Sequence, residues 1–257
     1  MFLGSRKRTS DAPATPTDDR PQGVGSAIDL TKFTATAPGL VDLYKKAGVS
    51  LEKRGLRGTR AAVYLVLDHS GSMSGYYGNG TVQALAERVL AAAAHFDDDG
   101  IVPAVLFESR AHEPEPIVLG SHDGRIAELH ATCPWGGTDY ACAIEAVVRH
   151  YQASGATDPA FVVFQTDGAP NSEADTESAL RHASKLPIFW QFIGFGHHSQ
   201  FDFLRRLDTL RHRAVDNAGF FAAGPDPRAM SDTDLYDRLM AEFPQWLVVA
   251  RAAGILR

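Results

Sequence analysis

The chain has 257 residues, of which 44% are hydrophobic, and carries a net charge of −6 at pH 7. This apolar content is enough for a folded core, so a chain that is disordered throughout is excluded. The acidic balance argues against a protein that binds nucleic acid through bulk electrostatic attraction. No apolar run reaches the roughly 20 residues that a membrane-spanning helix needs. The basic residues at 6–8 are not followed by the apolar stretch of a secretory signal, so we expect a cytoplasmic protein.

The N-terminal part predicts a tail and an extension ahead of the main domain. Residues 1–27 are rich in Thr, Pro, Asp, Gly and Arg without periodicity, which is typical of a disordered tail. Residues 28–58 contain apolar side chains at helical spacing from about Pro38 to Arg54, and Pro38 suits a first turn. We expect this helix to pack on the domain, which we assign to residues 59–257 with its C-terminal helices.

Strand and helix patterns alternate through the domain. Strands are predicted at about 61–67, 102–107, 117–119, 161–165, 188–194 and 219–222, and helices at about 81–96, 140–151, 172–184, 199–207 and 231–253, the last with a break near Pro244. Strands that alternate with helices of this length predict an α/β fold: a doubly wound, mostly parallel sheet with helices on both faces, as in Rossmann-like domains. Ligands of such sheets bind beyond the carboxyl ends of the strands.

The motif Asp68-His69-Ser70-Gly71-Ser72 directly follows an apolar strand. Asp68, Ser70 and Ser72 alternate, so three short oxygen-bearing side chains can meet where the chain turns, while alternation directs His69 away from them. Oxygen ligands favour hard cations such as Mg²⁺ or Ca²⁺, with Mn²⁺ as a further candidate. The pattern predicts a metal site at the rim of the sheet.

Two further segments carry matching chemistry. Gly136-Gly137-Thr138-Asp139 precedes a predicted helix, and Thr166-Asp167-Gly168 directly follows the strand at 161–165. Asp68 and Asp167 therefore lie on the same edge of the sheet. Read singly, these residues are equally compatible with turn formers and helix caps.

Together the three segments resemble the metal-ion-dependent adhesion site (MIDAS) of von Willebrand factor A (vWA) domains. The match of 65–73, 136–140 and 165–170 is similar to the vWA domains of tellurium-resistance gene clusters, and more distantly to those of copines. The resemblance implies an intact MIDAS in which Ser70, Ser72 and Thr138 bind a cation, Mg²⁺ first, through hydroxyl oxygens. Asp68 and Asp167 would act through coordinated water.

The resemblance also implies a binding role. The cation would accept an acidic group, a carboxylate or a phosphate, from a protein partner in a tellurium-resistance or stress-response system. Small calcium-binding proteins of the same clusters are the expected partners. Tyr76, Tyr77, Trp135 and His197 are candidate partner contacts; the alternatives are self-packed tyrosines, a lid formed by Trp135 and an ordinary surface loop at His197.

Two alternatives remain open. A metal-dependent hydrolase or phosphatase-like enzyme would use Asp68 or Asp167 to position a metal-bound water. However, phosphatases that place an Asp after the first strand need a second Asp two residues on, and that position is Ser70 here. A scaffold whose metal site is always filled is the other alternative.

Overall fold

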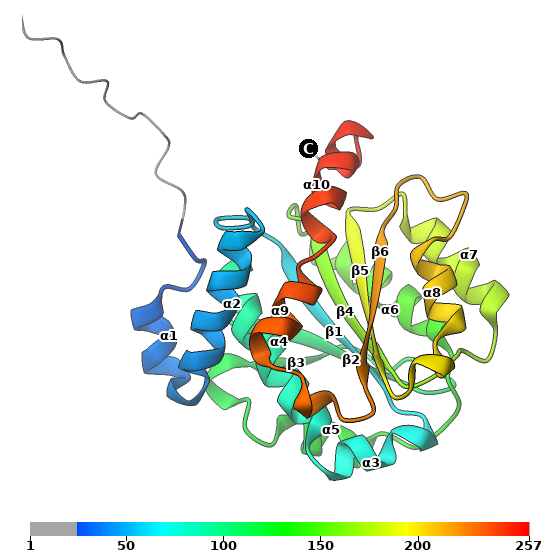
Figure 1. The fold of residues 1–257 in the computed structure, drawn as a ribbon, viewed down its shortest axis with the longest axis horizontal. Helices are drawn as coiled ribbons and strands as arrows, with labels where there is room; N and C mark the ends of the chain where they lie inside the picture. Colours follow the sequence, from blue (N-terminus) through cyan, green and yellow to red (C-terminus); the bar gives the residue numbers. More distant parts are fainter. Residues whose placement is uncertain (1–24, 257) are drawn as a thin grey trace, which may run out of the picture.

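The computed structural model describes residues 25–256 and contains one six-stranded sheet with helices on both faces (Figure 1). The strand order is β3-β2-β1-β4-β5-β6, and only β3 runs antiparallel to its neighbour. The strands are β1 Ala62–Asp68, β2 Ile101–Phe107, β3 Glu115–Val118, β4 Ala160–Thr166, β5 Ile188–Phe195 and β6 Ala218–Gly224. The predicted α/β fold with a mostly parallel sheet is confirmed.

Side chains of each strand alternate between two apolar layers, which explains why both faces need helices. In β1, Val63, Leu65 and Leu67 enter one layer while Tyr64 and Val66 enter the other. The helices are α1 Leu30–Thr36, α2 Val41–Lys53, α3 Ser74–Gly78, α4 Thr81–Phe96, α5 Arg125–Thr132, α6 Tyr140–Ser154, α7 Glu173–Ala183, α8 Asp202–Asp208, α9 Asp232–Leu239 and α10 Phe243–Ala252. Helices α6, α7 and α8 cover the second layer, and the remaining helices contribute to the first.

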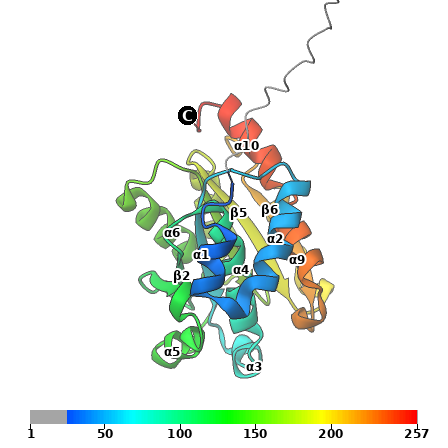
Figure 2. The ribbon, with the colours of Figure 1, turned by 90° about the vertical axis from the view of Figure 1, so that its left-hand side faces the viewer.

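The segment before β1 is integrated into the first layer. Phe33 of α1 and Tyr44 and Leu51 of α2 are buried, and the Ile28 amide donates to the Ala94 carbonyl of α4 at 2.8 Å. Figure 2 shows α1 and α2 in front of α4. Residues 1–24 of the predicted tail lie outside the described part of the chain.

Three short helices, α1, α3 and α5, are additions to the predicted elements. The segment that holds Tyr76 and Tyr77, expected as a loop, forms the single turn α3 and buries Tyr77. The C-terminal region divides into α9 and α10 at residues 240–242. The break comes just before Pro244, because a proline is tolerated in the first turn of a helix.

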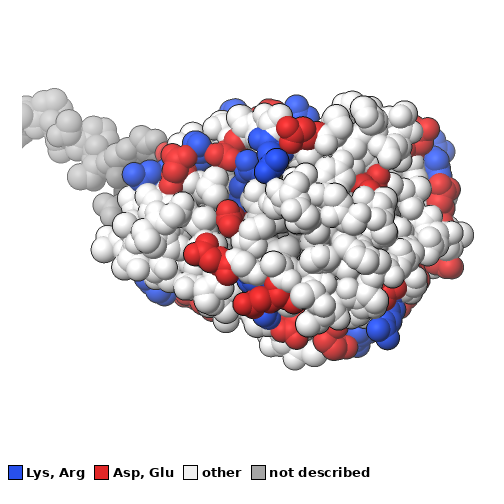
Figure 3. Space-filling model, turned by 90° about the horizontal axis from the view of Figure 1, so that it is seen from below, with Lys and Arg blue, Asp and Glu red and all other residues white. Residues whose placement is uncertain are grey.

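Helices α3 and α5 lie below the sheet, at the end where β1 and β4 finish (Figure 1). Seen from this end, much of the surface carries no charged side chain, and several acidic groups stand out on it (Figure 3). No helix among residues 25–256 is long and apolar enough to cross a membrane.

Candidate metal and partner-binding site

Asp68 is the last residue of β1 and is completely buried. One carboxylate oxygen accepts the Ser70 amide at 2.8 Å, and the other accepts the Thr166 hydroxyl at 2.6 Å. Thr166, the last residue of β4, in turn accepts the hydroxyl of Tyr140 at 2.7 Å. Asp68 is therefore held rigidly by two residues, Thr166 and Tyr140, that lie within the motifs but were not among the predicted site residues.

Two other candidate ligands meet Asp167 beyond the ends of β1 and β4. The hydroxyl oxygens of Ser70 and Ser72 lie 3.1 Å apart, and Ser72 donates to Asp167 Oδ1 at 2.9 Å. Ser72 and Asp167 are 95 positions apart in the sequence. The parallel pairing of β1 with β4 places the two loops side by side, so the register of the sheet assembles this oxygen cluster.

The loop that carries Thr138 lies against both of these segments. Gly136 forms a parallel bridge with Ser70, and the Thr138 carbonyl accepts the Asn171 amide at 2.7 Å. A Cβ at Gly136 would lie 2.5 Å from Glu108 Oε2, and one at Gly137 would lie 2.7 Å from the Asn171 side chain. The steric demand is stronger at Gly136, where a Cβ would also lie 2.9 Å from Glu108 Cβ, than at Gly137, where the end of the Asn171 side chain can move aside.

The cluster is negatively charged and opens to the surface, because Asp68 is buried whereas Ser72 is exposed. Burial raises the pKa of Asp68 to about 6 from its ordinary value of 3.8, although hydrogen bonds from Thr166 and Ser70 oppose this rise. Burial also raises the pKa of Asp167. Among residues 25–256, no Lys or Arg pairs with either carboxylate. An added cation would supply the missing positive charge.

The ring of His69, in the loop that follows β1, packs among the aromatic rings of neighbouring segments. His69 is buried, as alternation predicts, with its ring stacked on Trp135 at 4.0 Å between centroids. Its Nδ1 lies 2.9 Å from the Pro134 carbonyl oxygen and must donate, so its Nε2 accepts from Nδ1 of His130 at 2.7 Å. Burial lowers the pKa of His69, which favours this neutral form. His130 was missed by the sequence analysis because it lies on the unexpected helix α5.

The four candidate partner contacts differ in accessibility. Trp135 is 42% exposed, and Tyr76 is half-buried with its ring 5.3 Å from that of Phe195. His197 is exposed in the loop after β5, at the same edge of the sheet. Tyr77, by contrast, is 9% exposed and donates its hydroxyl to the Asp68 carbonyl at 3.1 Å. Tyr77 therefore packs beneath the loop that follows Asp68 and is not available as a surface contact.

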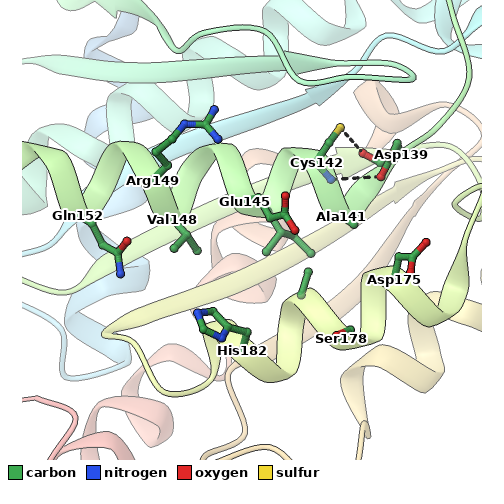
Figure 4. Close-up of a pocket in the computed structure, with 12 residues that line it drawn as sticks. Asp139, Ala141, Cys142, Glu145, Val148, Arg149, Gln152, Asp175, Ser178 and His182 are labelled. Carbon is green, nitrogen blue, oxygen red and sulfur yellow. Dashed lines mark hydrogen bonds between the residues drawn. The ribbon is translucent and has the colours of Figure 1, made fainter.

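An open groove between α6 and α7 begins beside the Thr138 loop, at Asp139 (Figure 4). Asp139 caps α6 by accepting the Cys142 amide at 3.1 Å. Acidic side chains lie near this end of the groove, whereas Arg149 and His182 lie farther along it. Burial raises the pKa of the Cys142 thiol to about 12, so this cysteine is protonated and unsuited to act as a nucleophile.

Comparison with known sequences identifies relatives across most of the chain. Residues 60–256 match the vWA-TerF-like model, which describes the vWA domain found in the C terminus of TerF. The uncharacterized protein YcbR of Bacillus subtilis (strain 168) is 38% identical over 223 residues, which cover 84% of this chain and 90% of YcbR.

Among solved structures, a von Willebrand factor type A protein supports the fold described above. The von Willebrand factor type A protein from Catenulispora acidiphila superimposes with a TM-score of 0.52 at 16% identity, over 72% of this chain and 42% of that chain. The manganese-loaded TRAP protein of Plasmodium vivax gives a TM-score of 0.46 at 22% identity, over 69% of this chain and 73% of that chain.

Proposed function

The chain belongs to the vWA-TerF-like family, and we propose that it is a metal-dependent protein-binding module. Asp68, Ser70, Ser72, Thr138 and Asp167 would together form an intact MIDAS for a divalent cation, Mg²⁺ first and Ca²⁺ or Mn²⁺ as alternatives. The observation that carries this proposal is the meeting of Ser70, Ser72 and Asp167 beyond the ends of β1 and β4.

The donor set fits a hard cation. Ligand oxygens about 2.1 Å from Mg²⁺ at right angles lie roughly 3.0 Å apart, and the Ser70 and Ser72 hydroxyl oxygens are 3.1 Å apart. The buried Asp68 carboxylate lacks a cationic partner among the described residues, and a divalent ion would compensate it. When bound, the ion would supply a Lewis-acidic position that a further oxygen ligand can occupy.

The surroundings favour an acidic group on a protein as that ligand. Hydroxyl ligands leave much of the charge of the ion uncompensated, so an anionic oxygen is attracted to it. The carboxylates of Asp68 and Asp167 would repel such a partner when the cation is absent, which would make recognition dependent on the metal. Trp135 and Tyr76 would add aromatic contacts beside the ion.

The resemblance to tellurium-resistance proteins extends this proposal to a biological setting. We place the module in a tellurium-resistance or related stress-response system, with small calcium-binding proteins of that system as partners. An acidic side chain on such a partner would complete the coordination of the cation.

A metal-dependent hydrolase is less well supported by the same residues. His69 is next to Ser70 in sequence, yet both of its ring nitrogens bond elsewhere, so it is not placed to activate a serine hydroxyl. The vWA assignment also favours binding over catalysis. A turnover assay with p-nitrophenyl phosphate in the presence of Mg²⁺ or Mn²⁺ separates the two functions, because the binding module is expected to show no turnover.

The proposal is tested by calorimetric titration of Mg²⁺, Ca²⁺ and Mn²⁺ into the protein, with and without acetate as a stand-in for the carboxylate of a partner. We expect saturable binding that Ser72→Ala and Thr138→Ala each weaken by at least about tenfold, since each removes a first-sphere oxygen. Ser74→Ala, at the exposed first residue of α3, is the matched control and should bind normally. Absence of binding under both conditions would refute the proposal.

Partner capture is the second measurement. Immobilised protein should retain an acidic partner in Mg²⁺ and release it on addition of chelator, and the Thr138→Ala variant should retain none. Capture that is unaffected by chelator would favour a scaffold that binds through a different surface.

A further inference from the structure

A second cluster of potential metal ligands lies apart from the oxygen site. Glu87 on α4 and His122 and Asp123, which precede α5, bring one ligand atom each to within 4.8 Å of one another. We infer that these three residues form a separate site for a divalent transition-metal ion, with Zn²⁺ as the first candidate. The inference does not depend on the function proposed above.

His122 is oriented as a metal ligand. Its Nδ1 lies 2.9 Å from the Leu119 carbonyl oxygen, and a carbonyl can only accept, so Nδ1 carries the proton. In the neutral ring the lone pair is therefore on Nε2, which lies 3.3 Å from Asp123 Oδ1. Ligand atoms about 2.0–2.2 Å from a zinc ion are roughly 3.0–3.5 Å apart, so this pair already has the spacing that shared coordination requires. A backbone carbonyl on the other ring nitrogen is the usual support of a ligating histidine.

The side chain of Gln83 forms hydrogen bonds to both segments that carry the proposed ligands. Its Nε2 donates to Glu87 Oε1 at 2.9 Å and to the His122 carbonyl at 3.1 Å. Its Oε1 accepts the Ile126 amide in the first turn of α5 at 3.2 Å. One amide thus links both ligand-bearing segments, so the site is organised before an ion arrives.

The charge of the cluster favours a cation. With His122 neutral, the two carboxylates carry the only formal charges among the three residues. Within the part of the chain that the structure describes, neither Glu87 nor Asp123 pairs with a Lys or Arg. The nearby Arg125 is engaged with Glu115 and Glu128 at 3.1 Å each. A divalent ion would balance the two negative charges.

The ligand types select a different metal from that of the oxygen site. One imidazole nitrogen and two carboxylates suit Zn²⁺, Co²⁺ or Ni²⁺ better than Mg²⁺, which prefers oxygen alone. A bound ion would fasten the start of α5 to α4, and α5 leads directly into the segment that holds Trp135 and Thr138. Three protein ligands also leave a position for water or for a group from another molecule.

The test is calorimetric titration of Zn²⁺ into the full chain in excess Mg²⁺, repeated with Co²⁺ under visible absorption spectroscopy. We expect one Zn²⁺ site per chain, which Asp123→Asn and Glu87→Gln each weaken by at least about tenfold. The Asp123 side chain is 96% exposed, so its replacement leaves the fold intact. The Co²⁺ bands should weaken in the same two variants.

Two controls separate this site from other metal binding. The double variant His197→Asn/His198→Asn removes the exposed histidine pair after β5, and Asp68→Asn removes a residue of the oxygen site. Both should bind Zn²⁺ like the wild type. The inference is overturned if the wild type binds no Zn²⁺, if Asp123→Asn and Glu87→Gln bind normally, or if binding disappears in the histidine double variant.

Discussion

At the scale of single residues, Asp68 combines full burial with a negative charge that no described Lys or Arg neutralises. A carboxyl whose pKa is raised in the folded state binds protons more readily when folded than when unfolded. Its contribution to stability is therefore favourable at low pH and is lost as the pH rises through about 6. At neutral pH the buried charge therefore lowers the stability of the metal-free protein, and a bound cation would offset this loss.

We expect Asp68→Asn to stabilise the metal-free protein at pH 7.5 by about 1–3 kcal/mol, because the amide removes the buried charge. The gain should be smaller at pH 4.5, where the folded carboxyl is protonated, and should vanish below about pH 3.8, where the carboxyl is protonated in both states. Urea unfolding in chelator at both pH values measures this difference, with the exposed Asp98→Asn as the matched control. Equal stability of Asp68→Asn and wild type at pH 7.5 would contradict the role of the buried charge.

Protonation of Asp68 should also govern metal affinity. The wild-type affinity for Mg²⁺ is expected to be constant above about pH 7 and to fall about tenfold for each pH unit below the pKa of about 6, since only the carboxylate attracts the ion. Titrations between pH 5 and 8 measure this profile. A flat profile would mean that Asp68 does not take part in binding.

Gly136 provides a steric test of the Thr138 loop. Gly136→Ala should reduce stability by about 1–3 kcal/mol and abolish Mg²⁺ binding, because the new Cβ meets both Glu108 Oε2 and Glu108 Cβ within 3.0 Å. Gly75→Ala is the matched control, since nothing lies within 4 Å of a Cβ there. Thermal unfolding and calorimetry of the two variants give the comparison, and normal binding by Gly136→Ala would argue against this loop as a source of ligands.

At the scale of elements, α9 is joined by polar contacts to α2, which precedes β1, and to α4, which follows it. Asp232 accepts from Lys46 of α2 and from Arg88 of α4, both at 2.8 Å. Asp237 accepts from Ser50 of α2 at 2.9 Å. The Arg88 side chain is only 16% exposed, so its charge depends on Asp232 for compensation.

Asp232→Ala should therefore destabilise the protein by about 1–3 kcal/mol, because it leaves Arg88 partly buried and unpaired. Asp234→Ala, on the same helix, should change stability by less than about 0.5 kcal/mol, because its pair with Arg238 is half-exposed on both sides. Chemical denaturation of both variants measures the contrast. Similar effects of the two substitutions would show that the contacts between α2, α4 and α9 contribute little.

The sequence predicted the long elements well and the short ones poorly. Helix α4 begins and ends where its periodicity indicates, since it buries apolar side chains over 16 residues. Helix α5 has eight residues with only Ile126 and Leu129 buried, and α3 contains two glycines, so neither shows a clear period. Short helices depend on tertiary contacts, which a local pattern does not reveal.

The candidate site also contains features that the sequence predicts and features that it does not. Four of the five proposed ligands, Asp68, Ser70, Ser72 and Asp167, follow from motifs that end predicted strands, and their placement at one sheet edge follows from parallel topology, whereas Thr138 precedes a predicted helix. The support of His69 by His130 joins positions 61 residues apart, and the burial of Tyr77 depends on how α3 folds back. Contacts of this kind are set by packing and are not encoded in a local pattern.

At the scale of the whole molecule, residues 28–58 complete the first apolar layer. Ile28, Phe33, Leu40, Tyr44 and Leu51 are each at most 5% exposed. At about 1.5–3 kcal/mol for each buried side chain, their removal costs on the order of 10 kcal/mol. This cost is comparable to the whole stability of an ordinary domain, about 5–15 kcal/mol.

A chain that begins at Arg60, where the family match starts, should therefore fail to fold stably. A chain that begins at Gly25 keeps all of the contacts described above and is the matched control. Circular dichroism and thermal unfolding distinguish the two chains. A cooperative transition of the shorter chain at the temperature of the control would show that the extension is dispensable.

The wide separation of the oxygen ligands along the chain has a consequence for biosynthesis. Ser72 and Asp167 are 95 positions apart, and a ribosome adds roughly 5–20 residues per second. Asp167 is therefore made about 5–20 seconds after Ser72, and β4 has to pair with β1 before the two side chains meet. A nascent chain holds no complete set of oxygen ligands during this interval. Loading of the proposed cation could therefore begin only after Asp167 has been made and β4 has paired with β1.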